Sequence, residues 1–183
     1  MSSYFRGQLA DYVKYHRDPW NCAMHVFGIV FLFLAAVLPL SQWSIAVFGI
    51  QTSAATIAVI PVLIYWFLLD FALGAAILVA AVVLLSIAAV IVGHATTADM
   101  WSLTAILIFV GVASQVIGHR VFERRQPALV DNPSHLLLGP MFVMAKLFTA
   151  LGFRRDLAII IQGQPQGAES CSQAGQFDVH PQA

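Results

Sequence analysis

Residues 54–93 read AATIAVIPVLIYWFLLDFALGAAILVAAVVLLSIAAVIVG and contain a single formal charge, that of Asp70. A helix that crosses the hydrocarbon core of a bilayer needs about 20 apolar residues, so this stretch is long enough for two crossings. An unpaired carboxylate is costly at the centre of a bilayer but not at its interface. We therefore predict a helical hairpin with crossings at about 54–69 and 71–93 and with Asp70 at the bend.

Two further apolar stretches flank this hairpin, at about 22–40 and 101–118. Over the whole chain, 60% of the residues are apolar, 10% are charged and the mean hydropathy is +0.82. Soluble globular domains carry about 25% charged residues, so this composition excludes them. The sequence thus predicts an all-α integral membrane protein with four transmembrane helices.

The basic residues give this predicted bundle an orientation. All nine Lys and Arg residues lie before residue 18 or after residue 119, and the loops at about 42–53 and 94–100 contain none. Short loops rich in Lys and Arg stay in the cytoplasm, and an even number of crossings brings both termini to one side. We therefore predict that both termini are cytoplasmic, in a bacterial inner membrane or an endoplasmic reticulum membrane.

Two segments outside the crossings have the pattern of amphipathic helices at the membrane interface, at about 3–16 and 140–152. The first has an apolar stripe at helical spacing, formed by Phe5, Leu9, Tyr12 and His16. In the second, Pro140 suits the first position of a helix. One amphipathic helix is therefore expected before the bundle and one after it.

The chain is interpreted as one membrane-embedded domain over residues 1–162, followed by a tail. Residues 163–183 are rich in Gln, Gly, Ser and Pro and are predicted to be disordered. The two cysteines, Cys22 and Cys171, form neither a disulfide framework nor a Cys-rich metal motif. No basic patch typical of nucleic-acid binding is present.

The predicted topology sorts the six histidines by their side of the membrane. His16 and His25 lie at the cytoplasmic start of the first crossing, and His119 lies at the cytoplasmic end of the fourth. His94 is on the opposite side and His180 is in the tail. Because neutral imidazole is the commonest metal-ligating side chain, the first three histidines are expected to form a metal site. The plainer alternative is that each polar ring only reaches towards the interface.

Polar side chains lie one helical turn from two of these histidines. Asn21 precedes His25 by four residues, and Gln115 and Glu123 flank His119 at the same spacing, so each set shares a helix face. Ligating histidines usually donate their second nitrogen to such groups. We therefore expect Asn21 and Gln115 to support the cofactor site, and Glu123 to act beside the catalytic histidines.

Three questions stay open at this point. His135 is also cytoplasmic and is an alternative fourth ligand. Nitrogen ligands suit iron or zinc rather than magnesium or calcium, and the residues do not choose between the two metals. Three arginines near His119 are expected either to hold an anionic substrate group or to anchor the protein to lipid phosphates, namely Arg120, Arg124 and Arg125.

At these residues the chain resembles the membrane-embedded 2-hydroxy-fatty-acid dioxygenases, typified by a fungal endoplasmic-reticulum enzyme of phytosphingosine breakdown. The resemblance covers nearly the whole chain up to about Phe153. The matching residues are Tyr15-His16, Asn21, His25, Gln115 to Arg124, Pro127-Ala128-Leu129, Asp131-Asn132 and Pro140 to Phe142.

This resemblance implies an Fe(II) enzyme that uses O2 to oxidise a 2-hydroxy fatty acid, releasing a fatty acid one carbon shorter and a one-carbon product. It also implies that His16, His25 and His119 are iron ligands. His94 and His135 fall outside the motif, and Glu123 matches it.

Two other functions remain as alternatives. In a zinc-dependent membrane lipid hydrolase, the same histidines would hold a zinc ion that activates water. In a non-catalytic membrane protein or transporter subunit, they would be structural. The sequence leaves the oligomeric state open.

Overall fold

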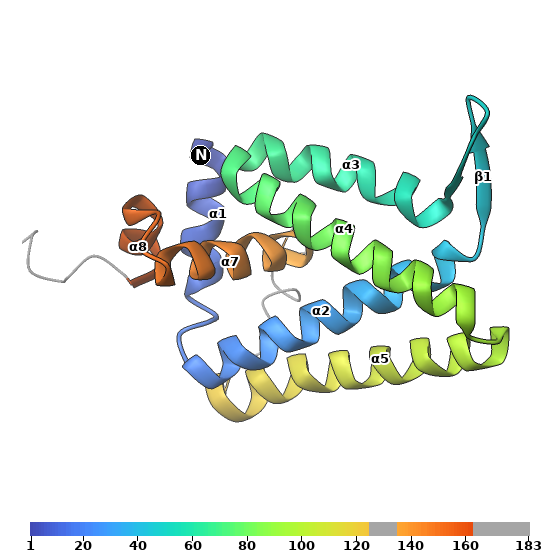
Figure 1. Cartoon of the computed structure of the whole chain (residues 1–183). Coiled ribbons are helices and arrows are strands. Elements are labelled where there is room, and N and C mark those ends of the chain that lie inside the picture. The colour runs from blue at the N-terminus through green and yellow to red at the C-terminus, as the bar shows by residue number, and fades with distance from the viewer. Residues whose placement is uncertain (125–134, 163–183) are drawn as a thin grey trace, which may run out of the picture.

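The structure is a computed structural model that describes residues 1–124 and 135–162, and the predicted tail at 163–183 lies outside these residues. Most of the described chain is helical (Figure 1). The elements in chain order are α1 (Ser3–Val13), α2 (Pro19–Ser41), β1 (Ser44–Val47), β2 (Ile50–Ser53), α3 (Ala54–Leu69), α4 (Phe71–His94), α5 (Thr97–Ile117), η1 (Gly118–Glu123), α7 (His135–Ala150) and α8 (Arg155–Gln162).

Four helices, α2 to α5, form an elongated bundle. α2 packs along α5, and α3 packs along α4 and also contacts α2. Figure 1 shows α1, α7 and α8 gathered at one end of this bundle, while the β1–β2 hairpin projects from the other. The end that carries α1, α7 and α8 is called the capped end below.

Three described helices are long and apolar enough to cross a membrane: α2, α4, and α5 together with η1. α3 has the required apolar character, but its 16 residues leave it shorter than these three. α7 and α8 would count as one further span only as a pair, and they are bent by 112°. The structure therefore supports an apolar membrane protein with three candidate spans, against the four predicted from the sequence.

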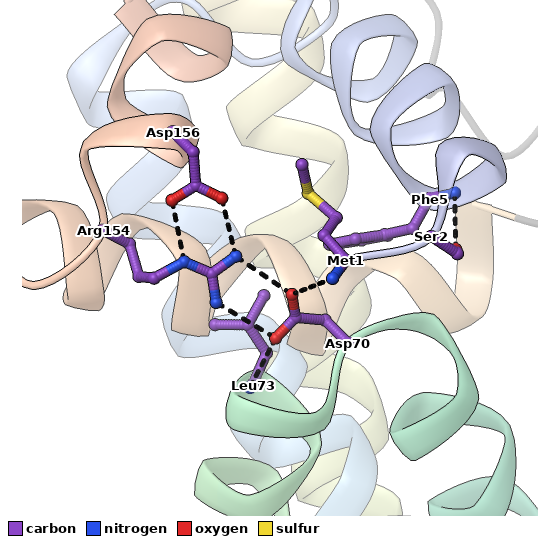
Figure 2. Close-up of polar contacts among 7 residues, drawn as sticks. All are labelled: Met1, Ser2, Phe5, Asp70, Leu73, Arg154 and Asp156. Carbon is purple, nitrogen blue, oxygen red and sulfur yellow. Dashed lines mark hydrogen bonds and ion pairs between the residues drawn. The ribbon is translucent and has the colours of Figure 1, made fainter.

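Asp70 lies at the bend of the predicted hairpin. It ends α3 and begins α4, where its carboxylate accepts a hydrogen bond from Leu73 N at 3.1 Å. Arg154 donates to both carboxylate oxygens of Asp70, at 3.2 and 3.0 Å, and also to Asp156 (Figure 2). The α3–α4 bend is thereby joined to the start of α8 at the capped end.

The start of α2 has a complete N-terminal cap. Asp18 accepts hydrogen bonds from Trp20 N at 2.8 Å and Asn21 N at 3.0 Å, and Pro19 occupies the first turn, where no backbone donor is needed. The helix therefore begins at Pro19 rather than near Cys22. Pro39 lies inside its last turn, and the helix ends at Ser41.

One local expectation, the position of Pro140, was wrong, and two elements had not been predicted. The loop at 42–53 contains a β-hairpin, in which Phe48 and Gly49 both adopt positive φ at the turn. α7 begins at His135, so Pro140 lies inside the helix and not at its first position. A short helix, α8, follows α7 after a bend at Gly152, whose φ of +78° suits glycine.

Candidate metal centre

Two glycines bring α2 and α5 close together. A Cβ on Gly28 would lie 2.6 Å from Gln115 Nε2 and 2.9 Å from Gly111 O, and a Cβ on Gly111 would lie 2.7 Å from Leu32 Cγ. Real Cβ atoms do not approach other atoms this closely, so both positions depend on glycine. Because His25 precedes Gly28 by three residues, this close packing brings it beside the end of α5.

His119 lies just beyond α5, in the π-helical turn η1 that continues it. The wider turn begins at Gly118, where an added Cβ would collide with Asn21 Oδ1. Such turns are rare in proteins, and those that do occur often lie at functional sites. Here the turn, together with the glycine, lets the end of α5 lie directly against the first turn of α2.

His16 reaches the same place from the connection between α1 and α2. Its ring stacks on Tyr12, with centroids 4.1 Å apart and planes 7° apart. Its Nδ1 lies 2.9 Å from the carbonyl oxygen of Tyr12, and because a carbonyl only accepts hydrogen bonds, Nδ1 must carry the proton. The lone pair of His16 is therefore on Nε2.

The three imidazoles converge in the interior of the protein. Their ring centroids are 4.2 Å apart for His16 and His25, 4.6 Å for His25 and His119, and 5.1 Å for His16 and His119. One nitrogen from each ring belongs to a set whose members all lie within 4.8 Å of one another. All three residues are buried, with at most 5% of their surface exposed.

Each of these rings has a buried nitrogen that makes no hydrogen bond to the described residues: His16 Nε2, His25 Nδ1 and His119 Nδ1. Buried polar atoms are rarely left without a partner, because desolvation is then uncompensated. A metal ion bound by the cluster would use such lone pairs. The described residues therefore fit a metal held by three nitrogens.

The charge state of His16 suits this role. The pKa of His16 is lowered to about 3, mainly by burial. The hydrogen bond to the Tyr12 carbonyl raises this pKa, whereas the nearby His119, Lys146 and His135 lower it further. The ring is therefore neutral at physiological pH, which is the form that binds metals. Burial also raises the pKa of Tyr12, so its hydroxyl keeps its proton.

Glu123, Asn21 and Gln115 contact backbone groups around the cluster. Glu123 Oε1 accepts hydrogen bonds from the backbone nitrogens of Arg17 at 2.6 Å and Asp18 at 2.7 Å, and from Asn21 Nδ2 at 3.3 Å. Gln115 Nε2 donates to His25 O at 3.3 Å. These three side chains join η1, α5 and the start of α2, so they position the histidines through the backbone.

A cavity of about 160 Å³ opens beside the cluster. The three histidines line it together with Tyr12, Ile29, Leu32, Phe33, Gln115, His135, Leu136 and Gly139. It is called the histidine cavity below. A metal at the cluster would have neighbouring space for a small ligand.

Residues 2–151 match the family model described as 2-hydroxy-palmitic acid dioxygenase Mpo1-like. The match covers more than half of the chain. The chain belongs to the Mpo1-like family. It is also 33% identical, over 161 residues, to the 2-hydroxy-palmitic acid dioxygenase MPO1 of Saccharomyces cerevisiae, an alignment that covers 86% of this chain and 87% of the yeast protein. No solved structure matches it. The resemblance noted in the sequence is thereby confirmed.

The other predicted ligand of this Mpo1-like chain, His135, is close to the cluster but outside it. His135 lines the histidine cavity and packs edge-on against Tyr12. Its Nε2 lies 3.6 Å from Asp11 Oδ2. Among the described residues, only the other three histidines meet the spacing of a metal site.

The predicted substrate arginines lie farther out. Arg120 and Arg124 are exposed and do not line the histidine cavity, and Arg125 lies outside the described residues. His94 ends α4 at the hairpin end of the bundle, opposite the end that carries the cluster, and His180 is outside the described residues.

Two neighbours of the Mpo1-like cluster were missed in the sequence. Tyr12 stacks on His16; the predicted apolar stripe contained both residues, but no role at the site was assigned to Tyr12. Lys146 Nζ donates to Cys22 Sγ at 2.8 Å, and the thiol donates to His16 O at 3.2 Å. No sequence pattern joins Lys146 to Cys22, because α7 reaches α2 only through the tertiary fold.

Proposed function

We propose that the chain is an iron(II)-dependent dioxygenase that oxidises 2-hydroxy fatty acids with O2 to fatty acids one carbon shorter. One observation carries the proposal: nitrogens of three buried imidazoles, two from the start of the chain and one from the end of α5, lie within 4.8 Å of one another in a member of the Mpo1-like family. The relative in yeast is named for 2-hydroxy-palmitic acid. An all-nitrogen ligand set suits iron and does not suit magnesium or calcium.

The proposed reaction balances with one O2 per substrate. The bond between the carboxyl carbon and the carbinol carbon breaks, and the carbinol carbon becomes the new carboxyl group. The old carboxyl carbon leaves as carbon dioxide with one water, and O2 takes the four electrons. Bound iron would supply the redox chemistry that lets O2 react with an organic substrate.

The residues of the chain hold and orient the reactants. His16, His25 and His119 would bind the metal, while Glu123, Asn21 and Gln115 fix the backbone that carries two of these histidines. His135 lines the cavity in which the substrate head group would lie. The positive charges of Arg120, Arg124 and Arg125 would attract the substrate carboxylate to this end of the bundle.

We further propose that the chain crosses the membrane four times, with both termini in the cytoplasm. α3 runs antiparallel to α4 and shares Asp70 with it, so it returns the chain to the capped end (Figure 1). All nine Lys and Arg residues then fall on the cytoplasmic side. The protein would be a multi-pass protein of a bacterial inner membrane or an endoplasmic reticulum membrane.

The deciding experiment is anaerobic purification with metal analysis, followed by addition of O2 and 2-hydroxypalmitate. We expect about one iron per chain and O2-dependent formation of the fatty acid one carbon shorter. Bound zinc, with lipid hydrolysis that needs no O2, would instead favour the membrane hydrolase. Neither metal nor product would favour a non-catalytic membrane protein.

A further inference from the structure

A second cavity, of about 240 Å³, lies between α2, α3, α4 and α7, extends farther from the capped end than the histidine cavity, and opens to the surface of the bundle beside Val26, Val30 and Ala58. Its twenty lining residues are all apolar by side chain. The one polar atom among these side chains, Trp66 Nε1, is engaged in a hydrogen bond of 2.7 Å to Leu137 O. This deep cavity therefore offers no group that would hold a polar ligand or an ordered water.

The deep cavity adjoins the histidine cavity. Ile29 and Phe33 of α2 line both of them. His25, Ile29, Phe33 and Val37 follow one another at intervals of four residues, so one face of α2 leads from the cluster into the deep cavity. A molecule with a polar head beside the histidines and an apolar tail would fit the two cavities together.

The length of the deep cavity can be judged from α2. The residues of α2 that line the cavity extend from Val26 to Leu40. At a rise of 1.5 Å per residue, this part of the helix is roughly 21 Å long. An extended palmitoyl chain is roughly 19 Å long, given carbon–carbon bonds of about 1.5 Å in a zigzag. The two lengths agree.

Alanines line the distal half of the deep cavity on two facing helices. Ala58 of α3 and Ala81 of α4 lie twelve and eleven residues from Asp70, at a depth of roughly 16 to 18 Å from the capped end. A larger side chain at either position would shorten the space available to an apolar tail.

We propose that the deep cavity holds the acyl chain of the 2-hydroxy fatty acid, and that Ala58 and Ala81 set the longest chain it accepts. This inference rests on the proposed function for the identity of the head group. The occupant is an unbranched acyl chain because the cavity is long, wholly apolar and joined to the metal site along a single helix face.

The test compares Ala81→Phe with Ala89→Phe, a matched control on the same helix at an exposed position that does not line the cavity. Equilibrium binding of palmitic acid and of the shorter lauric acid to the purified protein is measured, together with turnover of their 2-hydroxy derivatives. In Ala81→Phe, the preference for palmitic over lauric acid should fall at least about tenfold, since each buried methylene is worth a factor of about four. Ala89→Phe should keep the wild-type preference.

Leu84→Ala is a second test variant, which enlarges the distal half of the deep cavity and can be used if Ala81→Phe does not fold. It should raise the preference for acids longer than palmitic acid. Unchanged preferences in the folded variants would overturn the inference, even where the wild type shows O2-dependent turnover. A shifted binding preference without any turnover in the wild type would instead refute the proposed function and leave the acyl-chain cavity standing.

Discussion

At the scale of single residues, His119 is the clearest test of the metal centre. We expect His119→Ala to abolish iron binding and turnover, because it removes one of three converging nitrogens. The control is His94→Ala, at the end of α4 that lies away from the cluster. This variant should keep the iron content and activity of the wild type. Metal analysis measures the iron content of each variant, and size-exclusion chromatography shows whether the variant is folded. Wild-type turnover in a folded His119→Ala variant would contradict the proposed site.

Glu123 is expected to act by positioning. Its carboxylate accepts two backbone hydrogen bonds at the turn before α2 and one from Asn21. Loss of such a supporting group typically lowers metal affinity about 10- to 100-fold, and we expect this range for Glu123→Ala. Glu123→Gln, which keeps an acceptor oxygen, should lose less affinity. Equal and complete loss of iron in both variants would indicate that Glu123 binds the metal itself.

The sequence predicted the three histidines of the cluster but not the surroundings of the arginines. Helical spacing and charge distribution are enough to place His16, His25 and His119 at one end of a bundle. They do not specify the direction of side chains in a π-helical turn, where the spacing of an ordinary helix no longer applies. Arg120 lies on the exposed side of η1, because consecutive residues of a helix point in different directions and its neighbour His119 faces the interior.

At the scale of elements, the packing of α2 on α5 should control the metal site. Gly28→Ala would place a methyl group 2.9 Å from Gly111 O, and overpacking of this kind costs about 1–3 kcal/mol. We expect a lower melting temperature in detergent and weaker iron binding. Gly93→Ala is the control, because a Cβ there meets nothing within 4 Å and alanine favours a helix. Equal melting temperatures for the two variants would contradict this account of the α2–α5 contact.

The elements themselves were predictable to different degrees. The single charge of Asp70 in a long apolar stretch was sufficient to divide α3 from α4. The β1–β2 hairpin was missed, because its turn residues Phe48-Gly49 lack the Asn-Gly or Asp-Gly pair that marks most two-residue hairpin turns. The start of α7 was placed at Pro140 on local preference, whereas its contacts with α2 and α4 allow a proline inside the helix. Tertiary contacts of this kind cannot be obtained from a local pattern.

At the scale of the whole molecule, the Asp70–Arg154 pair joins the bend of the central hairpin to α8 (Figure 2). Removing Arg154 leaves the Asp70 carboxylate, whose side chain is 2% exposed, with less compensation for burial. We expect Arg154→Met to lower the free energy of unfolding by roughly 2 kcal/mol at pH 7. Arg155→Met, at the exposed neighbouring position, is the control.

The pH dependence of this effect has a defined sign. Burial opposes ionisation of Asp70, but hydrogen bonds from Arg154 and Leu73 and the nearby positive charges lower its pKa below the ordinary value. A carboxyl group with a lowered pKa in the folded state stabilises the protein above its unfolded pKa, near 4, and loses that contribution as the pH falls through the folded value. The difference in melting temperature between the wild type and Arg154→Met should therefore shrink below about pH 4. A difference that stays constant on acidification would show that the guanidinium acts through packing alone.

The proposed topology places the capped end of the bundle in the cytoplasm and the hairpin end on the opposite side of the membrane. Single cysteines at Lys14, in the capped end, and at Phe48, at the fully exposed tip of the hairpin, can be introduced after Cys22 and Cys171 are replaced by serine. With four crossings, a membrane-impermeant maleimide should label Lys14→Cys only from the cytoplasmic side and Phe48→Cys only from the opposite side. Arg124→Cys, beyond the cluster, should behave like Lys14→Cys, because the metal site needs His16 and His119 at the same end of the bundle. Labelling of Lys14→Cys and Arg124→Cys from opposite sides would be incompatible with a shared metal site, whatever its metal.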